Sequence, residues 1–218
     1  PGIAGYNIHN NSWERKDAPV LVDCLQQQPQ GRPTQLMIIL SEYELVETLP
    51  QIFFVRSLEP FCCPLCHSDK RTVVGSRNRK LIRNTGEKIV LRIRRLKCKN
   101  CVKIHHELPP EVVPYKRHEA KSIEDVLEGK DLLDTPADEY TLKRWRKWFA
   151  GLTHHLLGVL TSALLKSSGK MEKAPLTGDA LQRIRQTVGN APGWLSRVVQ
   201  TAIKNNSWVQ TRSAFHTG

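Results

Sequence analysis

Residues 63–66 read Cys-Pro-Leu-Cys and residues 98–101 read Cys-Lys-Asn-Cys, with 31 residues between the two pairs. Each Cys-x-x-Cys pair offers two thiolates from one tight turn, and four thiolates complete the tetrahedral shell of a structural zinc ion. A catalytic zinc keeps one coordination position for water, and nothing in this sequence argues for that arrangement. We therefore predict one structural Zn²⁺ ion bound by Cys63, Cys66, Cys98 and Cys101.

The gap between the pairs is longer than the roughly 15–20 residues common in zinc ribbons. Additional strand and loop between the cysteine pairs would account for this length. Three alternatives stay open from the sequence. The site could hold iron or an iron–sulfur cluster; His105 or His106 could replace one thiolate, although both are better explained as surface or strand residues; and Cys62 could compete with Cys63. Cys24 has no assigned role.

The segment between the cysteine pairs carries the positive charge of the whole chain. The protein has 33 lysines and arginines against 21 acids, a formal net charge of +12. From Lys70 to Lys103 there are 13 lysines and arginines and a single acid, Glu87, so the surplus of this segment equals that of the chain. A cluster of one sign repels itself unless it meets a counter-anion, which favours a polyanionic partner.

Duplex DNA is the partner we expect, and charge alone leaves RNA open. The absence of aromatic residues between Asp69 and Val113 argues against stacking on single-stranded bases. We expect Ile52 to Val55, Thr72 to Val74, Lys80 to Ile82 and Lys88 to Arg94 to form strands, with a turn at 84–87. In the last strand the apolar residues alternate with arginines. The residues expected to bind phosphate are Arg77, Arg79, Lys80, Arg92, Arg94, Arg95 and Lys97.

The C-terminal half has helical periodicity after the prolines at 109, 110 and 114. A short helix or turn is expected at 41–49 before the cysteine region, and longer helices at 122–129, 135–150, 152–166, 177–188 and 192–204. The helices at 122–150 have the order of a helix-turn-helix, and Gly151 is expected to end the second. Its candidate DNA-binding residues are Lys143, Arg144, Arg146 and Lys147, whereas Leu142, Trp145 and Phe149 face the core.

The sequence up to residue 36 is rich in Gln, Pro and Gly without periodicity, and we interpret it as a disordered leader. No secretory signal is recognisable at the start, and the longest nearly apolar run, Leu156 to Leu165, is about half of a membrane span. We expect a reducing bacterial cytoplasm and association with the nucleoid, with no membrane and no small-molecule substrate as partners.

The two cysteine pairs, the basic run Arg94 to Cys101 and the sequence His106-Glu-Leu-Pro109 resemble the zinc ribbons of bacterial insertion-sequence transposases. Residues 141–149 are similar to the second helix of small mobile-element proteins with the same layout. The resemblance implies a zinc ribbon followed by a helix-turn-helix, with a transposase or another mobile-element protein as a partner. The Asp-Asp-Glu catalytic domain of such transposases is not recognisable, because the 67 residues after 151 contain two acids, Glu172 and Asp179.

The sequence therefore predicts an α+β protein, a small N-terminal zinc β-ribbon followed by an all-α helix-turn-helix domain. The expected divisions are a leader at 1–36, the ribbon at 37–110, the helix-turn-helix at 111–151 and a helical region at 152–218. The expected function is zinc-dependent duplex-DNA binding, accessory or regulatory in transposition, without catalysis. Two alternatives stay open: the N-terminal part of a transposase or metal-dependent nuclease, and a protein-interaction module.

Overall fold

The computed structural model describes residues 37–130, 135–168 and 178–208. Six strands precede four helices in this part of the chain. The strands are β1 (Met37–Ile39), β2 (Tyr43–Leu49), β3 (Ile52–Ser57), β4 (Arg71–Ile82), β5 (Lys88–Cys98) and β6 (Ile104–Leu108). The helices are α1 (Ala120–Leu127), α2 (Glu139–Ser168), α3 (Ala180–Val188) and α4 (Trp194–Lys204). The expected leader at 1–36, and the role of Cys24, lie outside the described residues.

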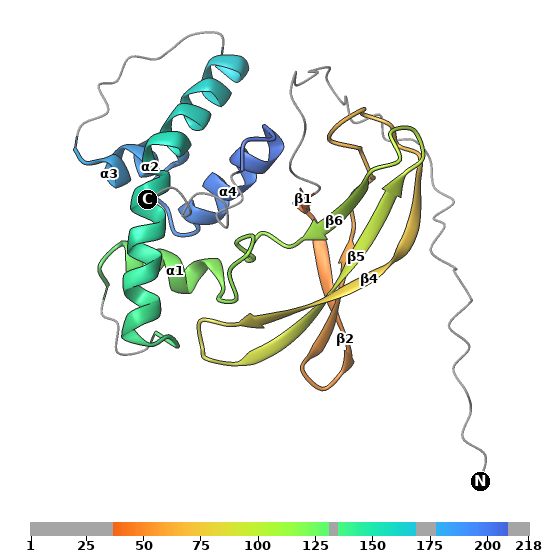
Figure 1. The fold of residues 1–218 in the computed structure, drawn as a ribbon, viewed down its shortest axis with the longest axis horizontal. Helices are drawn as coiled ribbons and strands as arrows, with labels where there is room; N and C mark the ends of the chain where they lie inside the picture. Colours follow the sequence, from red (N-terminus) through yellow and green to blue (C-terminus); the bar gives the residue numbers. More distant parts are fainter. Residues whose placement is uncertain (1–36, 131–134, 169–177, 209–218) are drawn as a thin grey trace, which may run out of the picture.

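All six strands belong to one mixed sheet that curls into a half-barrel (Figure 1). The order is β1-β6-β5-β3-β2, and β4 pairs with β5 along nearly its whole length. The other edge of β5 pairs in parallel with β3 near its start and antiparallel with β6 near its end. β5 is therefore the central strand, which pairs directly with β3, β4 and β6, while β1 and β2 pair with β6 and β3.

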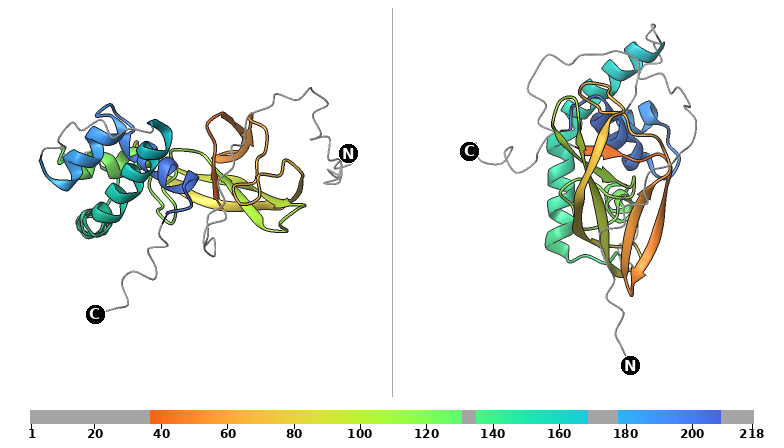
Figure 2. Two further views of the ribbon diagram at one scale, coloured as in Figure 1. Left: turned by 90° about the horizontal axis from the view of Figure 1, so that it is seen from above. Right: turned by 90° about the vertical axis from the view of Figure 1, so that its right-hand side faces the viewer.

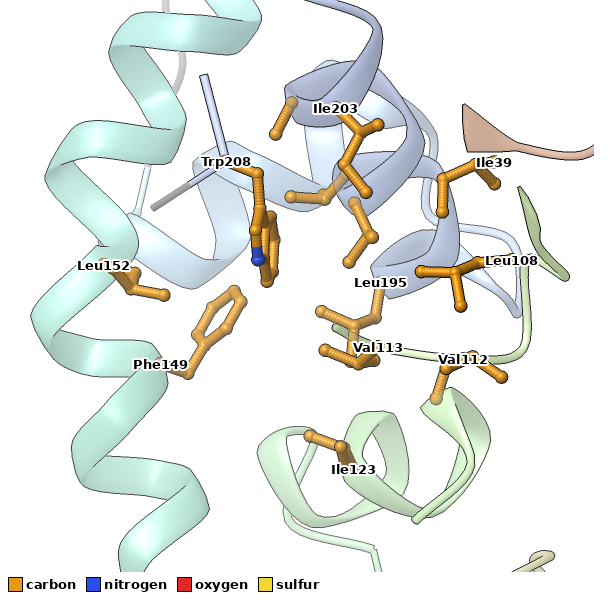
Figure 3. Packing of buried hydrophobic residues seen from close by; sticks show 14 of the residues in the cluster. Ile39, Leu108, Val112, Val113, Ile123, Phe149, Leu152, Leu195, Ile203 and Trp208 are labelled. Carbon is orange, nitrogen blue, oxygen red and sulfur yellow. The ribbon is translucent and has the colours of Figure 1, made fainter. Parts of the chain in front are cut away.

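The helices and the sheet share one hydrophobic core. Ile39, Leu108, Val112 and Val113 from the sheet and its following loop pack against Leu195 and Ile203 of α4, as Figure 3 shows. Phe149 and Leu152 of α2, Ile123 of α1 and Trp208 line the same interior. Figure 2 shows the helical layer set against one end of the curled sheet. The predicted small ribbon followed by an all-α domain is therefore wrong, because the helices complete the core of the sheet.

Several predicted elements need correction. Residues 43–49 form β2, not a helix, because they pair antiparallel with β3 from Tyr43 opposite Ser57 to Leu49 opposite Ile52, with a register shift between Glu47 and Leu49. The two short strands expected at 72–74 and 80–82 are one strand, β4. The strand at 88–94 and the turn after residue 83 are confirmed, and β5 continues to Cys98.

The predicted helix-turn-helix is not formed. A helix-turn-helix joins its helices by a turn of about 3–4 residues, whereas α1 ends at Leu127 and α2 begins at Glu139. α2 also runs through Gly151, which costs only about 1 kcal/mol in a helix interior and is offset by the apolar side chains buried on either side. The predicted inward positions Leu142, Trp145 and Phe149 are confirmed as buried.

Helix ends are fixed by carboxylates that the sequence only partly identifies. Asp138, and not Thr135, accepts the Thr141 backbone N–H at 2.6 Å, and Asp179 forms a capping box with Gln182. The buried carboxylate of Glu124 on α1 accepts the backbone N–H groups of Gly193 and Leu195 at 2.8 and 2.9 Å. A carboxylate at the positive end of a helix dipole is favourable, so Glu124 joins α1 to the start of α4.

One helix among the described residues, 139–167 of α2, is long and apolar enough to cross a membrane by length and composition. A core helix of a soluble protein passes the same test. Trp148, Leu156 and Leu160 of α2 are buried in the protein core, and 33% of the apolar window of this helix is buried.

Candidate metal centre and cationic track

The four predicted cysteines converge at one end of the β4–β5 hairpin. Their sulfur atoms all lie within 4.8 Å of one another. The Cys63 and Cys101 sulfurs are 3.6 Å apart and those of Cys66 and Cys98 are 3.5 Å apart. Four sulfurs at about 2.3 Å from a tetrahedral ion would be about 3.8 Å from each other. The geometry therefore fits one small metal ion, and the donor set fits a soft or borderline ion.

The two cysteine turns have the same backbone geometry. His67 follows the first pair with φ 56° and Val102 follows the second with φ 60°. Each of these residues donates its N–H to the carbonyl of the first cysteine of its pair, at 2.9 Å to Cys63 and 3.1 Å to Cys98. A positive φ is energetically unfavourable for valine. This backbone conformation therefore indicates that the surrounding structure fixes both turns.

The hairpin explains the long gap between the pairs. The first pair leads into β4, the chain turns after Arg83, and β5 returns to place Cys98 opposite Arg71. The backbone N–H of Lys99 also donates to the carbonyl of Lys70 at 2.9 Å. The cysteine cluster thus closes the open end of a hairpin whose other end is closed by a turn.

His105, for which a surface or strand position was favoured over a ligand role, lies on a strand but is buried against the cysteine cluster. It is fully buried on β6, and its Nε2 lies 3.4 Å from the sulfur of Cys63. Burial, with a smaller contribution from His106, lowers the pKa of His105, so the ring is neutral and its Nε2–H can donate to a thiolate. The register explains its position, because His105 pairs with Leu96 and so shares a sheet face with Cys98.

Hydrogen bonds and burial affect the thiols unequally. Burial raises the pKa of Cys63. Burial also acts to raise that of Cys66, but hydrogen bonds from the Ser68 backbone and the Asn100 side chain lower the pKa of Cys66 to about 6. Cys62 is not one of the four converging cysteines, so Cys63 is the ligand that the geometry selects.

The predicted phosphate-binding residues of the hairpin lie on two faces of the sheet. Alternation along β5 puts Ile89, Leu91 and Ile93 on one face, here called the core face, and Leu96 and Cys98 on the other, the cysteine face. By this alternation and the β4–β5 register, the core face also carries Arg77, Arg79, Arg95 and Lys97. The cysteine face carries Lys80, Arg92 and Arg94.

Two of these arginines hold the fold together. Arg94 donates Nε and Nη2 to the two carboxylate oxygens of Glu107 at 2.5 and 2.9 Å, and Glu107 is buried. Arg79 donates Nη2 to the carbonyls of Val113 and Lys116, both at 2.9 Å. The guanidinium groups of both arginines are therefore hydrogen-bonded within the protein. A residue whose only role is to bind phosphate would not need these partners.

The core-face arginines begin a line of neighbouring cations that continues onto α2. We call the residues Arg95, Arg77, Arg79, Lys116 and Arg144 the cationic track. His106 lies beside Arg95 and Arg77. Burial lowers the pKa of His106 most, and the charges of Arg95 and Arg77 lower it further. Burial and Arg77 lower the pKa of Arg79 to about 10, and burial and Arg144 lower that of Lys116 to about 8. The track therefore joins the hairpin to the helix that carries the second set of predicted residues.

The basic residues at the start of α2 are exposed. Lys143 pairs with Glu139 at 2.8 Å, an exposed pair that contributes little to stability. The guanidinium of Arg144 lies 5.6 Å from the ring centre of Tyr140. Arg146 and Lys147 are exposed on the outer side of the helix. These four residues were predicted from the sequence, whereas Lys116 was not, because its neighbour Arg144 lies on another element.

Comparison with known proteins adds one match. Residues 63–145 match the model of a family described as "Domain of unknown function (DUF6431)". The match begins at the first metal-site cysteine and ends at Trp145 of α2, so it includes the cysteine cluster, the hairpin and the whole cationic track. No curated protein and no solved structure matches the chain significantly.

Proposed function

We propose that the protein binds nucleic acid, duplex DNA in the first instance, through phosphate contacts along the cationic track, and that a structural Zn²⁺ ion in the four-cysteine cluster holds the hairpin in shape. The observation that carries this proposal is that Arg77, Arg79 and Arg95 share one face of the hairpin, and that Arg79 is hydrogen-bonded to the carbonyl of Lys116, a neighbour of Arg144 on α2. After burial, the charges of Arg77 and Arg144 lower the pKa values of Arg79 and Lys116, and a bound polyanion would relieve this repulsion.

Zinc is the metal proposed because four thiolates at tetrahedral spacing are its usual structural shell. The metal would supply rigidity: the strands then meet phosphates without first paying the entropy of ordering a flexible hairpin. Arg77, Arg95 and Lys97 on the core face, and Lys143, Arg144, Arg146 and Lys147 on α2, are the proposed phosphate ligands. Arg79 and Lys116 shape the track between them.

A comparison of the two hairpin faces tests the proposal. Arg77→Gln with Arg95→Gln removes two charges from the core face, and Lys80→Gln with Arg92→Gln removes two from the cysteine face of the same strands. Each phosphate contact contributes about 0.9 to the slope of log affinity against log salt. The first double variant should reduce the steepness of that slope by about 2, and the second should leave it unchanged, in fluorescence-anisotropy titrations of a 20-base-pair duplex. Equal slopes for both variants, or a wild-type affinity independent of salt, would refute the track.

The biological setting we propose is that of an accessory or regulatory protein of a bacterial mobile element. Its support is the sequence resemblance at the cysteine pairs and at residues 141–149. Binding to terminal sequences of a neighbouring element in preference to shuffled duplex of the same composition would be the expected result. Equal affinity for both would count against that setting while leaving nucleic-acid binding intact.

A further inference from the structure

A strained turn presents one aromatic side chain in the middle of the cationic track. Tyr115 has φ 64° and is 52% exposed. A left-handed conformation is unfavourable for a residue with a bulky side chain, and such strain persists only where the surroundings impose it. An exposed and strained aromatic residue therefore indicates a role beyond folding.

Arg79 imposes this conformation. Its Nη2 donates to the carbonyls of Val113 and Lys116, which lie on either side of Pro114 and Tyr115. The Lys116 N–H closes the same turn on the Val113 carbonyl at 3.1 Å. A largely buried guanidinium from the sheet thus fixes a four-residue turn, and the tip of that turn is the tyrosine.

Tyr115 is followed by Lys116, and the cations that start there lead to a second exposed tyrosine on α2. The ammonium of Lys116 lies 4.0 Å from the ring centre of Trp148 on α2, and Arg144 is a charged neighbour of Lys116. Arg144 in turn lies against Tyr140, which is 70% exposed. Among the described residues, Tyr115 and Tyr140 are the exposed aromatic side chains, and both lie beside members of the track.

Exposed rings flanked by fixed cations are the arrangement by which proteins bind unpaired nucleotides: bases stack on the rings while the cations hold the phosphates. We propose that Tyr115 stacks on a base that lies outside the double helix, so that the protein prefers nucleic acid with an unpaired stretch over fully paired duplex. This inference rests on the proposed function. It identifies a base-contacting residue just beyond the segment in which the sequence contains no aromatic residue.

The test compares a 20-base-pair duplex with the same duplex carrying a central unpaired bubble, using the full chain with zinc. Loss of one stacked base costs at least about fivefold in affinity. Tyr115→Gly should therefore weaken bubble binding at least fivefold and change paired-duplex binding less than twofold. Tyr115→Phe should keep the wild-type preference. Because glycine relieves the left-handed strain, Tyr115→Gly should also melt at the same or a higher temperature, which separates lost contact from lost folding.

Gln51→Gly is the matched control, since Gln51 is exposed with φ 62° in the β2–β3 turn. It should relieve similar strain without any change in binding. Unchanged bubble affinity in Tyr115→Gly would overturn the inference, and so would an equal loss on bubble and duplex or an equal loss in Tyr115→Phe. If Arg77→Gln with Arg95→Gln weakens both probes while Tyr115→Gly weakens neither, the stacking inference fails and the phosphate track stands. If wild type binds neither probe, the proposed function itself fails.

Discussion

The two ends of β5 are stabilised by different means. Near its start, Ile89, Leu91 and Ile93 join a core cluster of 29 buried residues that includes side chains from all four helices. Near its end, Leu96 and Cys98 belong to a second cluster of four buried residues on the opposite face, with Phe61 and Cys63. Four side chains bury too little apolar surface to hold a chain end. We therefore propose that β5 depends on core packing at one end and on a bound metal ion at the other.

The largest effect is expected from a substitution that disrupts the cysteine cluster at the end of β5 and leaves the helical core intact. Cys98→Ser should abolish stoichiometric zinc binding, because structural zinc contributes about 10–16 kcal/mol of binding free energy in small zinc peptides. Hydrogen exchange should then show loss of protection at the amides of Cys98 and Val102, while those of Val198 and Val199 in α4 keep theirs. Lys99→Ser, in the same turn, should change neither. Protection at Val102 that survives in Cys98→Ser would show that the turn does not depend on the metal.

A smaller effect is expected at the ion pair between Arg94 and Glu107, which lies on the cysteine face near the end of β5. Arg94→Gln leaves Glu107, 2% exposed, as a buried carboxylate without its cation. Removing one partner of a buried pair costs about 3–5 kcal/mol of unfolding free energy. Arg92→Gln, one position away on the same face of β5, should cost less than about 0.5 kcal/mol. Equal costs in urea denaturation would show that the Arg94–Glu107 pair is not a structural support.

The smallest expected effect concerns pH at the helical end. Burial lowers the pKa of His118, although the Pro136 carbonyl and Asp138 act to raise it. The unfolded chain therefore takes up a proton near pH 6.5 that the folded chain does not, so unfolding free energy falls as the pH drops below about 6.5. The loss should be about 1 kcal/mol or less, because His118 is only half-buried.

Tryptophan fluorescence in urea at saturating zinc measures this effect, since Trp145 packs against the His118 ring at 4.8 Å between ring centres. His118→Gln should lose less stability than wild type between pH 7.5 and 5.5. The other histidines are present in both proteins, so the difference isolates His118. Identical pH profiles would mean that His118 does not contribute.

The sequence was sufficient to identify the four cysteines that converge, because Cys-x-x-Cys spacing is a local property of one turn. Alternation likewise identified β5 at Lys88 to Arg94. β2 was mistaken for a helix because Tyr43, Leu45, Val46 and Leu49 suit helical spacing, and only pairing with β3 decides between the two. Sequence patterns therefore predicted the features that depend on residues close together in the chain, and not those that depend on strand pairing.

The sequence did not lead us to predict that the basic residues divide between the two faces of the β4–β5 hairpin. β4 carries a register shift between Val73 and Ser76, where Gly75 has φ 113°, and this irregularity changes the phase of alternation between the two halves of the strand. His105, Lys116 and Tyr115 gain their significance from partners on other elements. No pattern along the chain places Nε2 of His105 beside Cys63, or Lys116 beside Arg144.

Cobalt(II) titration of the purified full chain tests most directly whether four thiolates hold one metal. One Co²⁺ per chain should bind with the intense visible absorption of a tetrahedral thiolate site, be displaced by Zn²⁺, and protect Cys63, Cys66, Cys98 and Cys101 from alkylation, as read by mass spectrometry. A chain that binds no cobalt, or in which any of these four thiols stays reactive at saturation, would contradict the metal centre on which the ordered hairpin and its cationic track depend.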